Sequence, residues 1–109
     1  MNLETLLQRT GWTLIQPCDA NPDITGVFIG DLLSYVMGQG EAGQVWITMQ
    51  SHPNVIAVAA LKEFAAVILI DEILLDPQAA EHAQANGIPV VRSPLNAYDS
   101  AKVLMQLGL

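Results

Sequence analysis

The sequence predicts an α/β fold: a compact layered structure with a mainly parallel sheet of about five strands and helices on its faces. Short β-branched runs alternate along the chain with segments of helical periodicity, as in βαβ units. The segment Ala65–Ile70 is apolar without interruption, as in a central strand buried on both faces. The 109 residues, 51% hydrophobic and 14% charged, supply one core, so we expect one domain over residues 1–109.

The N-terminal third predicts a helix, a strand and a loop. Leu3, Leu6 and Leu7 recur at helical spacing. Asn2 is placed to cap this helix and Gly11 to end it. The segment that follows is expected to form a strand over Trp12–Ile15 and a surface loop over Cys18–Asp23, which is rich in turn-forming residues.

The middle of the chain predicts strand, glycine turn, helix and strand. Ile24–Ile29 is rich in β-type residues, and the turn follows at Gly30. Four apolar residues then recur at helical spacing: Leu32, Leu33, Val36 and Met37. Gly38 and Gly40 are expected to end this helix. The next strand is expected over Gln44–Met49.

The C-terminal half repeats the alternation of helix and strand. We expect a helix over Pro53–Phe64, because proline is tolerated in the first turn, and then the buried strand. Asp76 is placed to cap the next helix, which ends at Gly87. The last strand is expected over Ile88–Val91. The last helix is expected to begin after a capping Asn96 and to carry an apolar stripe of Ala97, Ala101, Leu104, Met105 and Leu107.

Charge and cysteine content narrow the function classes. Four basic against eleven acidic residues give a net charge of -7, which disfavours nucleic acid and anionic membranes as partners. A single cysteine, Cys18, forms no intrachain disulfide, and with two histidines it gives no metal-site spacing. The N-terminus lacks signal-peptide features, so we expect a cytoplasmic protein. The apolar run Val55–Ile70 is too short for a bilayer span and carries two charges.

Candidate ligand-binding residues lie in the loops expected at the carboxyl ends of the strands, where α/β sheets bind ligands. We expect the loops Gly26–Ser34, Thr48–Asn54 and Arg92–Asn96 to converge around a small anion such as a nucleotide. No cofactor or metal is predicted. The candidate residues are Gly30, Asp31, Ser34, Thr48, Gln50, His52, Asn54, Arg92 and Ser93.

Each candidate also has a structural interpretation. Ser51 or His52 is placed to cap the helix that follows, and Asp31 to cap the preceding one. Arg92 is equally suited to pair with a nearby acidic residue. His52 has no nucleophile or orienting partner at a recognised spacing, and no glycine-rich phosphate loop is present, so we predict no catalytic residue.

Several segments resemble the DRTGG domain family, and the resemblance covers nearly the whole chain. They are Gly26–Met37, Val45–Thr48, Asn54–Ala60, Ala65–Leu69 and Gly87–Val90. The chain is most similar to small stand-alone members, related to the non-catalytic N-terminal domain of HPr kinase/phosphorylase. The resemblance implies that compact α/β fold and a regulatory or dimer-forming module found beside catalytic domains, pyrophosphatases among them.

The chain departs from the family pattern in two places. Where family members have an acidic-basic pair at the start of the central helix, this chain has Ser51–Asn54. His52 would therefore have to replace the arginine of that pair. The glycine-rich turn after the buried strand is here Asp71–Ile73, which is acidic and bulkier. The departures weaken the expectation of anion binding by family contacts.

The expected function is a non-catalytic regulatory or interaction module. We expect a homodimer, because large apolar groups stand near strand and helix ends: Phe28, Tyr35, Met37, Trp46 and Met49. The alternatives are a ligand-free scaffold that docks a partner protein, and a small hydrolase or phosphotransferase that uses His52 with Asp31.

Overall fold

The computed structural model describes all 109 residues and contains a five-stranded sheet of order β1-β5-β4-β3-β2. Strands β2 to β5 run parallel, and β1 is antiparallel to β5. The predicted mainly parallel α/β sheet is therefore confirmed. The strands are β1 (Thr13–Leu14), β2 (Gly26–Ile29), β3 (Gln44–Thr48), β4 (Ala66–Leu69) and β5 (Val90–Arg92).

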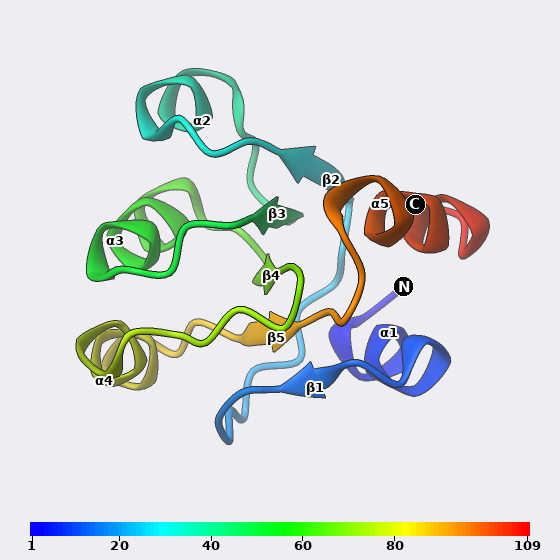
Figure 1. Ribbon diagram of the computed structural model, residues 1–109, viewed down its shortest axis with the longest axis horizontal. Coiled ribbons are helices and arrows are strands. Elements are labelled where there is room, and N and C mark those ends of the chain that lie inside the picture. The colour runs from blue at the N-terminus through cyan, green and yellow to red at the C-terminus, as the bar shows by residue number, and fades with distance from the viewer.

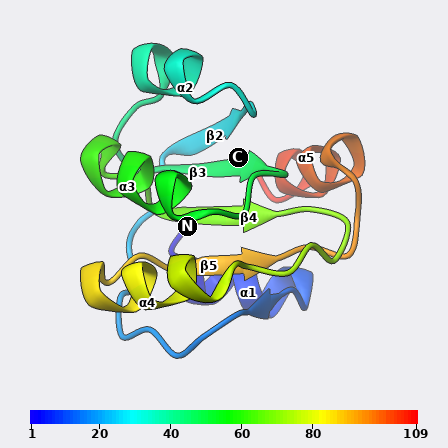
Figure 2. The same cartoon turned by 60° about the vertical axis from the view of Figure 1, so that its left-hand side comes forward.

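Five helices cover the two faces of this sheet unequally (Figure 1). Helices α2, α3 and α4 lie on one face, here named the three-helix face, and α1 and α5 lie on the other, the two-helix face. The parallel strands point the same way, so their carboxyl ends form one edge of the molecule (Figure 2). The helices are α1 (Leu3–Thr10), α2 (Leu33–Gln39), α3 (Pro53–Lys62), α4 (Pro77–Asn86) and α5 (Ala97–Gln106). None of them combines the length and apolar composition needed to cross a membrane.

Local signals set most of the helix ends. The side chains of Asn2, Asp76 and Asn96 each accept a hydrogen bond from a backbone N–H in the first turn of α1, α4 and α5. These bonds satisfy donors that have no partner within the helix. Gly11 and Gly87 end α1 and α4 with φ of 71° and 63°, a left-handed conformation that favours glycine. These five predicted caps and stops are confirmed, whereas Gly38, predicted with Gly40 to end the second helix, lies within α2, and Gly40 alone follows its end.

The core lies on both faces of the central strands. Val45 and Ile47 of β3 join a 12-residue cluster with α1 and α5, whereas Trp46 between them joins a second 12-residue cluster with α2, α3 and α4. In β4, Ile68 packs into the first cluster and Val67 into the second. This alternation is the period-two pattern of a pleated strand. The predicted burial of the apolar β4 segment on both faces is confirmed.

Some element boundaries differ from the prediction because backbone groups outside the sheet compete for the hydrogen bonds of the strand ends. The second strand starts at Gly26, since the Ile24 N–H donates to the carbonyl oxygen of Met1 instead. The last strand starts at Val90, since the Ile88 N–H donates to Ala83 in the last turn of α4. Helix α3 ends at Lys62, two residues earlier than predicted, and Glu63 after it adopts a left-handed conformation.

Two side chains were assigned to the wrong environment. Trp46 was predicted to be incompletely covered, but it is fully buried, and its Nε1 donates to the carbonyl oxygen of Gly30 at 2.8 Å. Its ring packs against Phe64, 5.5 Å between centroids. Met105 was predicted to belong to the apolar stripe of the last helix, yet 66% of it is exposed. The apolar stripe of α5 that reaches the core is therefore narrower than predicted.

Candidate functional site

The loops that follow β2 and β3 are joined by the Asp31 carboxylate. Its Oδ1 accepts hydrogen bonds from Thr48 Oγ1 and from the backbone N–H of Met49, both at 2.8 Å. The Gln50 side chain donates back to the Asp31 carbonyl oxygen at 3.0 Å. Because β2 and β3 are adjacent parallel strands, their carboxyl ends bring these residues together. The first two predicted loops thus lie side by side, as expected.

This bonding corrects the structural interpretation of Asp31. Helix α2 begins after Leu32, whose side chain makes no capping bond, and Asp31 binds the neighbouring loop rather than the helix. Thr48 is buried, and its hydroxyl also accepts from the Gln50 N–H at 3.2 Å. Asp31, Thr48 and Gln50 therefore hold the shape of the loops. Gly30, beside them, is held by Trp46 through its carbonyl oxygen.

The start of α3 leaves polar side chains open to solvent. His52 occupies the N-cap position with extended backbone, but its side chain makes no capping hydrogen bond. The predicted capping role of the His52 side chain is wrong. The backbone of Ser51 instead accepts from the Asp76 N–H at 3.0 Å, which ties this loop to the start of α4. His52, Asn54 and, across the joined loops, Ser34 are exposed and accessible to a ligand.

Arg92 and Ser93 lie at the same edge of the sheet but bond to other partners. Arg92 Nε donates to the carbonyl oxygen of Ile73 at 3.4 Å, in the loop after β4, and the side chain is half-buried. The Ser93 hydroxyl is buried and lies 2.7 Å from the hydroxyl of Ser100 in α5. The Ser93 hydroxyl therefore anchors α5, and a surface ligand has no access to it.

The chain crosses to opposite faces after β4 and β5, and this switch point is where open α/β sheets bind ligands. Here the two loops are bonded together: the Asp71 N–H donates to Leu95 and the Glu72 N–H to Ser93. Asp71 and Glu72 both adopt positive φ, 54° and 59°, which is the conformation that glycine takes most readily. These backbone bonds close the crevice between β4 and β5.

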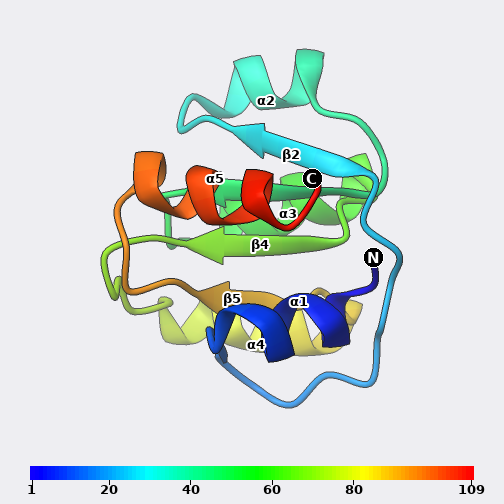
Figure 3. The same ribbon diagram turned by 90° about the vertical axis from the view of Figure 1, so that its right-hand side faces the viewer.

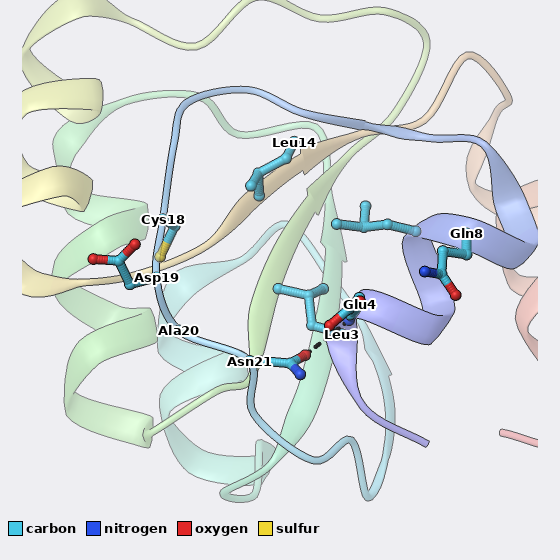
Figure 4. Close-up of a pocket in the computed structure, with 9 residues that line it drawn as sticks. Leu3, Glu4, Gln8, Leu14, Cys18, Asp19, Ala20 and Asn21 are labelled. Atoms are coloured by element: carbon cyan, nitrogen blue, oxygen red, sulfur yellow. Dashed lines mark hydrogen bonds between the residues drawn. The ribbon is translucent and has the colours of Figure 1, made fainter.

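Three hollows open on the surface, and none is lined by a candidate residue. The first, about 300 Å³, lies where the connection after β1 passes α1 (Figure 4). Asn21 projects toward Glu4 there, and its Oδ1 accepts the Glu4 N–H at 2.8 Å. The second, about 230 Å³, adjoins it and shares Cys18, Asp19 and Ala20. Both hollows are therefore built around the connection between β1 and β2.

The third hollow, about 360 Å³, is lined by residues of β2 and α5, two elements that lie beside each other on the two-helix face (Figure 3). We name it the β2–α5 groove; it is lined by Val27, Ile29, Tyr98, Ala101, Lys102, Met105 and Leu109. This groove was not among the sites predicted from the sequence. The available signal was a second apolar stripe in the last helix, since Tyr98, Ala101, Met105 and Leu109 follow helical spacing.

Side chains that commonly bind metals do not cluster in this structure. No group of three or more His, Cys, Asp or Glu side chains lies close enough together to hold a metal ion. Asp31 Oδ1 accepts its hydrogen bonds from Thr48 and Met49, and His52 is not among the donors. The arrangement is that of a three-layer α/β domain with braced loops and an exposed helix start.

This class of domain has a known structural counterpart. The fold is similar to the crystal structure of the CBS and DRTGG domains of the regulatory region of Clostridium perfringens pyrophosphatase complexed with an activator, diadenosine tetraphosphate. The TM-score is 0.74 at 13% sequence identity, over 95% of this chain and 46% of that one. The chain thus spans about half of that structure, and the likeness shows the fold. The predicted DRTGG-like α/β fold is confirmed.

Sequence comparison adds no family assignment. No family model matches the chain, and no curated protein matches its sequence. Membership of the DRTGG family, and the relation to HPr kinase/phosphorylase, remain predictions.

Proposed function

We propose that this protein is a non-catalytic regulatory module that binds a small anionic ligand, with a nucleotide as the first class to test. The observation that carries the proposal is the fold. A structure that shares this fold over about half of its length is the regulatory region of a pyrophosphatase, and it was crystallised with a nucleotide activator. The proposal includes membership of the DRTGG family as a stand-alone relative of the HPr kinase N-terminal domain.

The proposed binding surface is the carboxyl edge of the sheet around the start of α3. The first turn of a helix presents unpaired N–H groups and a partial positive charge, which favour an anion. His52 and Asn54 are exposed at this helix start, and Asp31, Thr48 and Gln50 hold the adjoining loops in place. In this proposal these three residues shape the surface, whereas His52, Asn54, Ser34 and Arg92 contact the ligand.

We propose further that the module works as a homodimer in the cytoplasm. Large apolar side chains are exposed, among them Tyr35 at 56% and Met49 at 55%. Exposed apolar surface of this kind is typical of interaction sites. The net charge of -7 supports a protein or small-molecule partner rather than nucleic acid or a membrane.

Ligand binding can be tested by thermal unfolding with diadenosine tetraphosphate, ATP, AMP and sugar phosphates. A ligand at a hundred times its Kd that binds only the folded state stabilises it by about 2.7 kcal/mol. We expect the nucleotides to raise Tm, and His52→Ala and Arg92→Ala to reduce the shift. His82→Ala in α4 and Arg9→Ala in α1 are matched controls that should leave it unchanged. No Tm shift with any compound would contradict the proposal.

A ligand-free scaffold is the second candidate. The exposed β2–α5 groove favours it, because apolar surface of this kind can hold a partner protein. A scaffold would show no Tm shift with any of these compounds but would retain a protein partner. The two functions are therefore separated by the same titration. A hydrolase or phosphotransferase that uses His52 with Asp31 is the third; ATP turnover by purified protein that disappears in His52→Ala would replace the proposal.

A further inference from the structure

Strand β2 is an edge strand without the usual protection. In the sheet order β1 and β2 are the two outer strands, and β1 has only two residues. The four residues of β2 include no charge and no proline. In a parallel pair, alternate residues direct their N–H and C=O groups away from the neighbour, so half of these groups in β2 have no strand partner. Proteins normally guard such an edge with charges, proline, bulges or a covering helix.

The β2–α5 groove places apolar side chains beside this open edge. Figure 3 shows α5 lying beside β2. The exposed fractions are 49% for Ile29, 77% for Tyr98 and 66% for Met105. Val27 and Ile29 alternate with Phe28, which packs on the opposite face near Tyr35. The edge therefore offers both unpaired backbone groups and an adjoining apolar surface. These are the two elements of recognition by strand addition.

We propose that β2 pairs antiparallel with β2 of a second copy of this chain, forming a continuous ten-stranded sheet in which each β2–α5 groove is covered by the other copy. The proposal deepens the homodimer proposed above and rests on it. A two-fold axis perpendicular to the sheet keeps both α5 helices on the same face. Both grooves then meet across the new pair of strands.

The groove lacks the acidic side chains that make two copies repel each other elsewhere on the surface. Two chains of net charge -7 repel each other over most of their surface. Lys102 is the one charged side chain that lines the groove, so neither copy brings an acidic side chain into it. The remaining lining side chains are apolar and lose water when the two copies meet.

The direction of α5 makes the surface self-complementary. Helix α5 runs opposite to β2, so its start lies beside the end of the strand (Figure 3). An antiparallel β2 pair therefore brings the Tyr98 end of one helix toward the Met105 and Leu109 end of the other. Contacts between a thioether and an aromatic ring are favourable, and the aromatic ring supplies rigid apolar area.

The test is the mass in solution, measured by sedimentation equilibrium from micromolar to hundreds of micromolar chain. We expect the parent protein to be a dimer in this range. Ile29→Lys and Met105→Lys should each raise the dimer dissociation constant at least about tenfold, which corresponds to about 1.4 kcal/mol. Leu61→Lys is the matched control: it adds the same charge at a leucine that is 69% exposed on α3, and it should leave the dimer unchanged.

Three outcomes would overturn the inference: a monomeric parent protein throughout the range, a dimer that survives both lysine variants, or equal loss in Leu61→Lys. Met105→Lys lies on an exposed helix position, so it remains informative if Ile29→Lys does not fold. A dimer that survives both variants would leave the homodimer proposal standing and remove only this surface. The nucleotide titration is read separately, so its failure is distinguishable from failure here.

Discussion

The two faces of the sheet are covered differently although the same strands build both. On the three-helix face, α2, α3 and α4 each lie in the crossover between two consecutive parallel strands (Figure 1). Strands β2 to β5 follow one another across the sheet in chain order, and crossovers between parallel strands are right-handed. All three helices must therefore lie on one side of the sheet. The two-helix face receives only the segments before and after this series, α1 and α5. Topology therefore leaves β2 incompletely covered on that face.

The two faces differ in how far their apolar side chains are buried. Trp46, on the three-helix face of β3, is fully buried against Phe64. Ile29 and Met105, on the two-helix side of the β2 edge, are 49% and 66% exposed. We expect changes on the first face to act on folding and changes on the second to act on association.

The largest effect is expected from Trp46→Ala. The change removes a fully buried ring and a hydrogen bond to Gly30, and truncation of a buried aromatic residue costs about 3–5 kcal/mol. Met105→Ala, on the exposed side of α5, should change the stability of the monomer by no more than about 0.5 kcal/mol. Urea unfolding at a concentration below the dimer range measures both. Equal losses would show that the two faces are not distinct.

A smaller loss is expected from Asp31→Ala, which separates the loops after β2 and β3. The carboxylate accepts one bond from Thr48 and one from the Met49 N–H, and loss of such charge-assisted bonds at an exposed site costs about 1–2 kcal/mol. Asp31→Asn is the control, because a side-chain amide oxygen accepts the same two bonds. We expect it to retain most of the stability in urea. An asparagine variant as unstable as the alanine variant would mean that the bonds are not the cause.

A gain is expected from Glu63→Gly. Glu63 follows α3 with φ 56°, and a left-handed conformation costs an L-residue roughly 1–2 kcal/mol. Glycine avoids that cost but loses more entropy on folding, so a net stabilisation of about 0.5–1 kcal/mol is expected. Glu81→Gly removes the same charge from within α4 and should destabilise by about 1 kcal/mol. Differential scanning calorimetry should show Tm changes of opposite sign.

The sequence predicted most of the fold because its signals are local. The capping side chains of Asn2, Asp76 and Asn96 and the left-handed glycines act within one helical turn, so their positions in the chain locate the helix ends. Alternating strands and helices then restrict the topology to a parallel sheet with crossovers. Boundaries moved by a few residues where distant backbone groups compete, as at Ile24.

The candidate site was less predictable because its bonds join segments far apart in the chain. Asp31 binds Thr48, 17 residues away, and this depends on β2 and β3 being neighbours. Arg92 bonds to Ile73, 19 residues away, for the corresponding reason at β4 and β5. The burial of Trp46 and the exposure of Met105 depend on where α2 and α5 pack. None of these contacts has a signature within a single stretch of sequence.

The central claim is that the open β2 edge is where two copies associate, and amide hydrogen exchange of the parent protein tests it directly. The measurement follows individual β2 amides by NMR at several chain concentrations under otherwise identical conditions. We predict that amides facing away from β3 exchange fast in dilute solution and become protected as concentration rises, while β4 amides stay protected throughout. Exchange at the outer β2 amides that does not change with concentration would contradict the claim.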